Sequence, residues 1–111
     1  MANDASPLLG ALGICRKAGR LLHGYDRVEE AVVRGKAYLV LLACDASERT
    51  VQHMKDTCQG MVPCRVMPLS TGELRMLTPK PAAVFAVTDE NFARLCAKHL
   101  TDSKKEESAN G

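Results

Sequence analysis

The 111-residue chain has no tryptophan, and its only Phe and Tyr residues are Tyr25, Tyr38, Phe85 and Phe92. So few rings argue against a protein that binds single-stranded nucleic acid by stacking bases on a row of aromatic side chains. No apolar run approaches the roughly 18 residues of a membrane-spanning helix. The N-terminus also lacks the basic and apolar segments of a secretory signal. The sequence therefore predicts one soluble domain without a membrane partner.

Metal-binding and catalytic motifs are absent as well. The chain has five cysteines, but no two of them have the C-x-x-C spacing that is typical of structural zinc sites. We interpret Cys15, Cys44, Cys58, Cys64 and Cys96 as small buried hydrophobic residues of a protein in the reducing cytoplasm. There is no glycine-rich phosphate loop, no H-E-x-x-H and no G-x-S-x-G pattern. These absences predict a protein that is not an enzyme and that uses neither a metal nor a cofactor.

Hydrophobic patterns predict helices and strands that alternate along the whole chain. Strands are expected at 20–24, 38–43, 62–67 and 82–87, and helices fill the intervals and both ends, the last at 91–100. The apolar runs at 38–43 and 82–87 favour central strands, whereas Pro63 favours an edge. Strict alternation predicts an α/β fold, a three-layer α/β/α sandwich around a small four-stranded mixed sheet. Residues 1–100 are expected to form this domain, followed by a disordered polar tail at 101–111.

The net charge of +2 conceals an uneven distribution. Residues 13–27 carry a local charge of 4 − 1 = +3, so the other 96 residues sum to 2 − 3 = −1. The charged residues of this segment are Arg16, Lys17, Arg20, Arg27 and Asp26. In the same segment Gly24 joins a short strand to a helix, for which Asp26 and Glu29 match a capping box. A helix N-terminus with basic neighbours is a candidate phosphate-binding surface, and an ordinary solvated surface is the alternative.

Five short motifs occur in an order that resembles the ribosomal L7Ae/L30e family, and within it the small bacterial YlxQ-type proteins. They are L-L-G-A-L-G-I-C-R-K-A-G at 8–19, R-G-K-A-x-L-V-L-L-A at 34–43, D-A-S at 45–47, V-P at 62–63 and A-V-T-D-x-x-F-A at 86–93. The resemblance spans about residues 8–100 and implies an L30e-like fold. It also implies binding to a kink-turn, a sharply bent RNA duplex that contains tandem sheared G·A pairs.

The same resemblance implies where RNA would be contacted. The family uses the loop after the first strand and the start of the second helix, with the pattern G-x-N-E and a Lys three residues later. The matching residues are Gly24, Tyr25, Asp26, Arg27 and Glu30. Only the glycine is kept. An ionised Asp26 accepts hydrogen bonds but donates none, Arg27 can donate to guanine O6 and N7, and Glu30 repels phosphate.

A second family contact is the loop before the last strand, where Lys80 is expected to touch phosphate. The full set of predicted RNA-binding residues is Lys17, Arg20, His23, Gly24, Tyr25, Asp26, Arg27, Glu30, Thr78, Pro79 and Lys80. The predicted partner is a structured RNA, ribosomal or regulatory, and with it the ribosome or other ribonucleoprotein components. Because Glu30 stands where the family has Lys, a protein-interaction module with little RNA affinity is the alternative.

Overall fold

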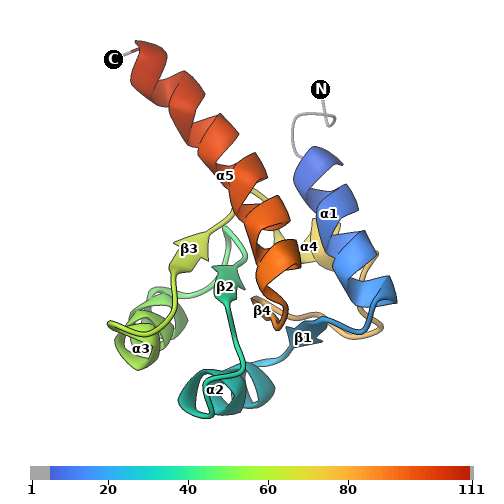
Figure 1. Cartoon of the computed structure of the whole chain (residues 1–111), viewed down its shortest axis with the longest axis vertical. Helices are drawn as coiled ribbons and strands as arrows, with labels where there is room; N and C mark the ends of the chain where they lie inside the picture. Colours follow the sequence, from blue (N-terminus) through green and yellow to red (C-terminus); the bar gives the residue numbers. More distant parts are fainter. Residues whose placement is uncertain (1–5, 111) are drawn as a thin grey trace.

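A computed structural model describes residues 6–110, and the predicted succession of helices and strands is confirmed (Figure 1). The elements are α1 (Ser6–Lys17), β1 (Leu21–His23), α2 (Tyr25–Val33), β2 (Leu39–Leu42), α3 (Glu48–Cys58), β3 (Cys64–Val66), α4 (Thr71–Leu74), β4 (Val84–Val87) and α5 (Glu90–Asn110). No helix in this part of the chain combines the length and the apolar character that a membrane span requires.

The four strands form one mixed sheet in the order β1-β4-β2-β3. Strand β4 runs antiparallel to both of its neighbours, whereas β2 and β3 are parallel. The prediction that the two apolar runs form the central strands is confirmed, as is the edge position of the strand that follows Pro63. Strands β1, β2 and β3 therefore end where β4 begins. We call the end of the sheet at which β1, β2 and β3 finish the carboxyl edge. The opposite end, at which these three strands begin, is the amino edge.

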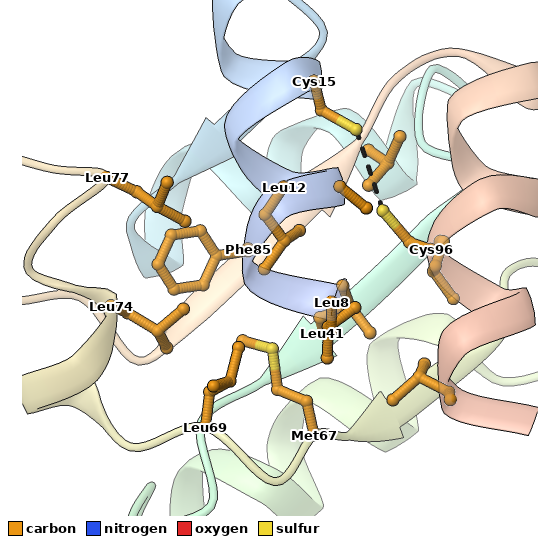
Figure 2. Close-up of a cluster of buried hydrophobic side chains, with 14 of the residues drawn as sticks. Leu8, Leu12, Cys15, Leu41, Met67, Leu69, Leu74, Leu77, Phe85 and Cys96 are labelled. Atoms are coloured by element: carbon orange, nitrogen blue, oxygen red, sulfur yellow. Dashed lines mark hydrogen bonds between the residues drawn. The ribbon is translucent and has the colours of Figure 1, made fainter. Parts of the chain in front are cut away.

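Helices cover both faces of the sheet, as the predicted three-layer sandwich requires. Side chains alternate along β2. Leu39 and Leu41 pack with α1 and α5 in what we call the first core cluster, whereas Val40 and Leu42 pack with α2 and α3 in the second core cluster. Strand β4 alternates in the same way. Phe85 has no exposed surface and lies at the centre of the first cluster, between the strands and α1 (Figure 2).

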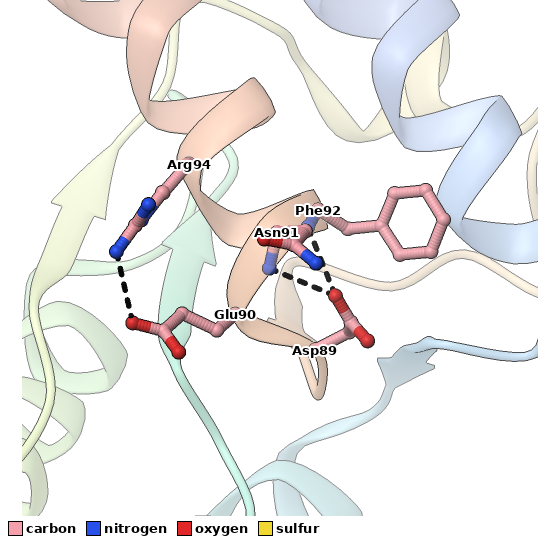
Figure 3. A network of polar contacts seen from close by, with 5 residues as sticks. All are labelled: Asp89, Glu90, Asn91, Phe92 and Arg94. Atoms are coloured by element: carbon pink, nitrogen blue, oxygen red, sulfur yellow. Dashed lines mark hydrogen bonds and ion pairs between the residues drawn. The ribbon is translucent and has the colours of Figure 1, made fainter.

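Three helices begin with a side chain that accepts hydrogen bonds from the first turn. Ser47 accepts from the backbone N–H of Thr50 at 3.1 Å and caps α3. A capping box of Ser70 and Glu73 opens α4. Asp89 accepts from the backbone N–H of Asn91 at 2.8 Å and opens α5 (Figure 3). These caps satisfy N–H groups that would otherwise lack a partner.

Burial of the cysteines differs from the prediction at two positions, Cys44 and Cys64. Cys15, Cys58 and Cys96 are buried, and the sulfur atoms of Cys15 and Cys96 are 3.7 Å apart between α1 and α5 (Figure 2). Burial, followed by the neighbouring Cys64, raises the pKa of the Cys58 thiol to about 12. Cys64 is half-buried, whereas Cys44 is exposed. The prediction of burial is wrong for Cys44 because β2 ends at Leu42 and Cys44 already lies in the turn that follows.

Helix α5 continues beyond the end that the sequence predicts. The expected helix stops at 100, whereas α5 reaches Asn110 and Figure 1 shows its last turns running past the sheet. Extending a helix that has already nucleated fixes one residue per added hydrogen bond, and the Lys and Glu residues at 104–107 are good helix formers. Leu100 is buried in the core, and the division between domain and tail after it stays a prediction.

Candidate functional site

The two loops that the sequence singles out lie together at the carboxyl edge. The backbone N–H of Gly24 donates to the carbonyl of Val84 at 3.0 Å, and Ala43 N–H donates to the Ala83 carbonyl at 2.9 Å. The loop 75–83 therefore joins β4 at the point where β1 turns into α2. The antiparallel pairing of β1 with β4 produces this meeting of segments that are 84 − 24 = 60 residues apart.

Helix α2 starts without a side-chain cap. Gly24 is the N-cap residue with φ 100° and ψ 137°, a backbone conformation that glycine adopts without strain. The first helical hydrogen bond is from Val28 N–H to the Gly24 carbonyl at 3.1 Å. The N–H groups of Tyr25, Asp26 and Arg27 precede that bond and have no acceptor within the helix. Together with the helix dipole they form a site that attracts an anion.

The predicted capping box at Asp26 and Glu29 is wrong. Because Gly24 itself makes the turn out of β1, the helix begins at Tyr25 and Asp26 lies inside its first turn rather than at the N-cap. The Glu29 carboxylate contacts Nε2 of His53 on α3 at 3.4 Å instead of the start of its own helix. The buried side of α2 consists of Val28, Ala31 and Val32.

Tyr25 faces α3 rather than solvent. Its ring meets the ring of His53 edge to face, with centroids 5.2 Å apart. Burial, and then the negative charges of Glu29 and Asp26, raise the pKa of the Tyr25 phenol, which therefore stays protonated. Tyr25 is half-buried and packs with the second core cluster. Its side chain positions the start of α2 against α3 and leaves the backbone of the first turn exposed.

The basic residues divide into two groups. Burial lowers the pKa of His23, and the positive charges of Arg27 and Arg16 lower it further, so these three side chains share one neighbourhood. Arg20 lies at the other end of β1, where its carbonyl accepts from Thr88 N–H at 2.9 Å. That end and Lys17, which precedes it, are separated from Gly24 by the three residues of β1, roughly 10 Å.

Arg16 is the residue that the sequence-based set omits. It belongs to the basic segment, but it is adjacent in sequence to Lys17, which the set contains. The sequence alone does not show which of the two side chains faces the site. The pairing of β1 with β4 and the packing of α1 decide which of the two comes near His23.

Glu30 does not stand alone on α2. Its carboxylate pairs with Arg34 at 3.1 Å, one helical turn further on. A shallow groove of about 260 Å³ lies beside β1 and is lined by Arg27, Glu30, Arg34 and Lys36. These four side chains give the groove a net charge of 3 − 1 = +2. Both partners of the ion pair are largely exposed, so the pair contributes little to stability. It does offset the repulsion between Glu30 and an approaching anion.

The second loop presents some of its predicted residues and buries another. Thr78 is only 5% exposed, and its hydroxyl donates to the carbonyl of Lys80 at 2.6 Å. This bond holds the loop in shape, and Leu77 anchors the loop in the first core cluster. Pro79 and Lys80 are exposed. Lys80 can therefore reach a ligand at the carboxyl edge, whereas Thr78 has a structural role.

A further contact ties the carboxyl edge together between the end of β2 and the start of α4. The Asp45 carboxylate accepts from the backbone N–H of Thr71 at 3.0 Å and from its hydroxyl at 2.8 Å. These hydrogen bonds, the hydroxyl first, lower the pKa of Asp45. Asp45 thus remains ionised and fixes a neighbouring loop of the same edge.

Known proteins resemble the chain over most of its length. It is 32% identical over 87 residues to RNA-binding protein YlxQ of Enterococcus faecium, an alignment that covers 78% of this chain and 84% of that protein. The chain belongs to the YlxQ family. RNA-binding protein YlxQ of Bacillus subtilis (strain 168) is also 32% identical, over 83 residues that cover 74% of this chain and 83% of the relative. No family model matches the sequence.

Solved structures share the fold of this YlxQ-family chain. A protein of unknown function from Bacillus halodurans C superposes with a TM-score of 0.78 at 29% identity, covering 85% of this chain and 96% of the other. The 15.5kD RNA binding protein of Giardia lamblia superposes with a TM-score of 0.72 at 21% identity, covering 93% and 89% respectively. The α/β sandwich predicted from the sequence is therefore a fold that an RNA-binding protein also adopts.

Proposed function

We propose that this YlxQ-family chain is a non-enzymatic RNA-binding protein of the L7Ae/L30e type and that its carboxyl edge recognises a kink-turn-like RNA. The observation that carries the proposal is the uncapped start of α2 at Gly24, placed where the loop 75–83 enters the sheet and flanked by Arg27 and Lys80. The names of the two YlxQ relatives supply RNA as the class of ligand. The cytoplasm and its ribonucleoprotein particles are the expected setting.

The residues at this edge suggest a division of labour. The free N–H groups of the first turn of α2 and the Lys80 ammonium bind phosphate, which positions the RNA without reading its sequence. Arg27 donates to the O6 and N7 atoms of a guanine, and Asp26 accepts from a base amino group. A bent RNA exposes such edges, whereas a regular A-form helix hides them in a deep, narrow groove. The half-buried Tyr25 does not serve as a stacking surface.

A gel-shift experiment tests both levels of this proposal. One RNA contains a kink-turn, and the control RNA has both G·A pairs replaced by Watson–Crick pairs. Tighter binding of the kink-turn RNA is expected. Equal affinity for the two RNAs would overturn kink-turn recognition, and no binding of either at moderate salt would overturn RNA binding itself.

The substitution Arg27→Ala is expected to weaken binding to the kink-turn RNA by about 1–3 kcal/mol, because it removes a guanine contact and one positive charge. The matched control is Arg94→Ala on α5, an exposed arginine at the amino edge. Titration of labelled RNA followed by fluorescence anisotropy measures both variants. An Arg27 variant that binds as tightly as the Arg94 variant would remove Arg27 from the interface.

RNA affinity is expected to rise as the pH falls from about 8 to about 6. In the free protein burial and the charges of Arg27 and Arg16 lower the pKa of His23. A bound phosphate offsets that repulsion, so the pKa is higher in the complex. The state with the higher pKa binds more protons, and acid therefore favours the complex, by up to about tenfold per unit of pKa difference. Anisotropy titrations at constant ionic strength, repeated with His23→Gln, measure the dependence, which the variant should lose.

A further inference from the structure

A second groove lies at the amino edge, at the other end of the strands from the proposed RNA surface. It has a volume of about 320 Å³ and runs between α5 and the beginnings of β2 and β3. Its strand side consists of Tyr38, Leu39, Pro63 and Arg65. Tyr38 N–H donates to the Val87 carbonyl at 2.8 Å, which places the groove where β4 ends. The two surfaces are therefore independent of each other.

The groove exists because small side chains of α5 face the sheet there. Ala93 and Ala97, one helical turn apart, form its helix side together with the ion pair of Glu90 and Arg94. Figure 3 shows this pair on one side of the first turn of α5 and the Asp89 cap on the other. Larger residues at 93 and 97 would fill the space beside β3. The lining is thus apolar in the middle and charged at the rim.

The groove continues into the outer edge of β3, which within residues 6–110 pairs with no strand other than β2. Strand β3 bonds to β2 through the Pro63 carbonyl, which accepts from Val40 N–H, and through Met67 N–H, which donates to the Leu42 carbonyl. Hydrogen bonds to one neighbour use alternate residues of a parallel strand. The backbone groups of Cys64 and Val66 therefore point away from β2, toward the open side of the last strand in the sheet. Such an edge is a template for another peptide strand.

The charge of the groove is positive. Glu90 and Arg94 pair at 3.2 Å and offset each other. Arg65 has no carboxylate within ion-pair distance among the residues that the structure describes, and its side chain lines the groove beside β3. The groove is therefore left with one unpaired guanidinium next to an apolar lining that includes Tyr38, a residue that is 47% exposed.

We propose that the amino-edge groove and the open edge of β3 bind an extended acidic peptide segment of a partner protein. The peptide adds as a fifth strand beside β3 and bonds to the backbone of Cys64 and Val66, as in other cases of strand addition. One apolar side chain enters the groove, and a carboxylate pairs with Arg65. A nucleic acid would satisfy Arg65, but it cannot supply alternating N–H and C=O groups to the strand edge. This inference goes beyond RNA binding and does not depend on it.

Phage display with random nine-residue peptides on the full chain tests the proposal. Peptides that alternate apolar and acidic residues are expected to be enriched, and the enriched peptide, made synthetically, should shift the amide NMR signals of Cys64 and Val66 but not those of Tyr25 or Arg27. No enrichment, enrichment of basic peptides, or shifts confined to the carboxyl edge would each overturn it. An adjusted peptide with Lys in place of its acidic residues should not bind.

Two charge reversals separate this inference from the proposed function. Arg65→Glu should lower peptide affinity at least tenfold and leave binding of the kink-turn RNA unchanged, whereas Arg27→Glu should do the opposite. Circular dichroism shows whether each variant keeps its fold. If Arg65→Glu instead weakens RNA and spares the peptide, the groove is part of an RNA surface and the peptide proposal is wrong. If neither variant binds RNA less well but Arg65→Glu loses the peptide, only the RNA proposal fails.

Discussion

Replacing Phe85 by alanine is expected to lower the free energy of unfolding by about 3–5 kcal/mol. Phe85 is fully buried on a central strand, and its ring contributes to the cluster that joins the sheet to α1 and α5. Truncation removes this apolar contact and leaves a cavity, because the surrounding backbone is held on both sides by β1 and β2. Since a domain of this size is stable by only about 5–15 kcal/mol, the variant should lose a large share of its stability. Urea denaturation measures the difference.

Phe92→Ala is the matched control for that experiment. Phe92 is half-buried and packs at the margin of the same cluster, so a smaller loss of stability is expected. Similar losses for both variants would contradict the central position of Phe85. The consequence reaches the candidate site as well, because the Phe85 and His23 rings lie with their centroids 6.5 Å apart. Phe85→Ala should therefore also weaken RNA binding under conditions in which the protein is still folded.

Affinity for the kink-turn RNA is expected to fall by about three orders of magnitude, about 4 kcal/mol, when salt is raised tenfold. Arg16, Lys80 and the start of α2 offer contacts for roughly three phosphates, and each neutralised phosphate makes the negative slope of log K against log salt steeper by about 0.9. The modest net charge of +2 adds little long-range attraction. Anisotropy titrations at five salt concentrations between about 50 and about 500 mM give the slope.

The variant Lys80→Ala assigns part of that slope to one residue. It should make the negative slope less steep by about 1. It should also weaken binding of the kink-turn RNA and of its control equally, because a phosphate contact carries no sequence information. A slope that Lys80→Ala leaves unchanged would place Lys80 outside the interface. A wild-type slope close to zero would contradict phosphate binding at the carboxyl edge.

The fold follows from the sequence where burial decides the pattern. Two apolar runs predict the central strands, and Pro63 predicts an edge, because these features reflect the solvent exposure of whole elements. Predictions about the ends of elements depend on single residues and are less secure. Asp26 has the sequence pattern of an N-cap, but Gly24, with its positive φ, is the N-cap residue, so the helix starts two residues earlier. Cys44 has apolar neighbours, yet the strand has already ended before it.

The candidate site is only partly visible in the sequence. The first loop is recognisable from Gly24 and the basic residues around it, and the resemblance to a known family adds the second loop. Which side chains come together depends on pairing over long distances. Arg16 comes near His23, Arg20 lies at the far end of β1, and Thr78 turns inward, none of which local patterns indicate. The amino-edge groove depends on two alanines of α5 and has no sequence motif.

The pairing of β1 with β4 also governs when the molecule can fold. Leu21 lies opposite Val87, 87 − 21 = 66 residues further along the chain, and β4 separates β1 from the other two strands. Contacts of such long range form late because the intervening chain must first be closed into a loop. On a translating ribosome β1 has no partner strand, and Gly24 N–H no acceptor, until Val84–Val87 has left the exit tunnel. The proposed RNA surface is therefore not assembled in a nascent chain whose Val84–Val87 segment is still inside the tunnel.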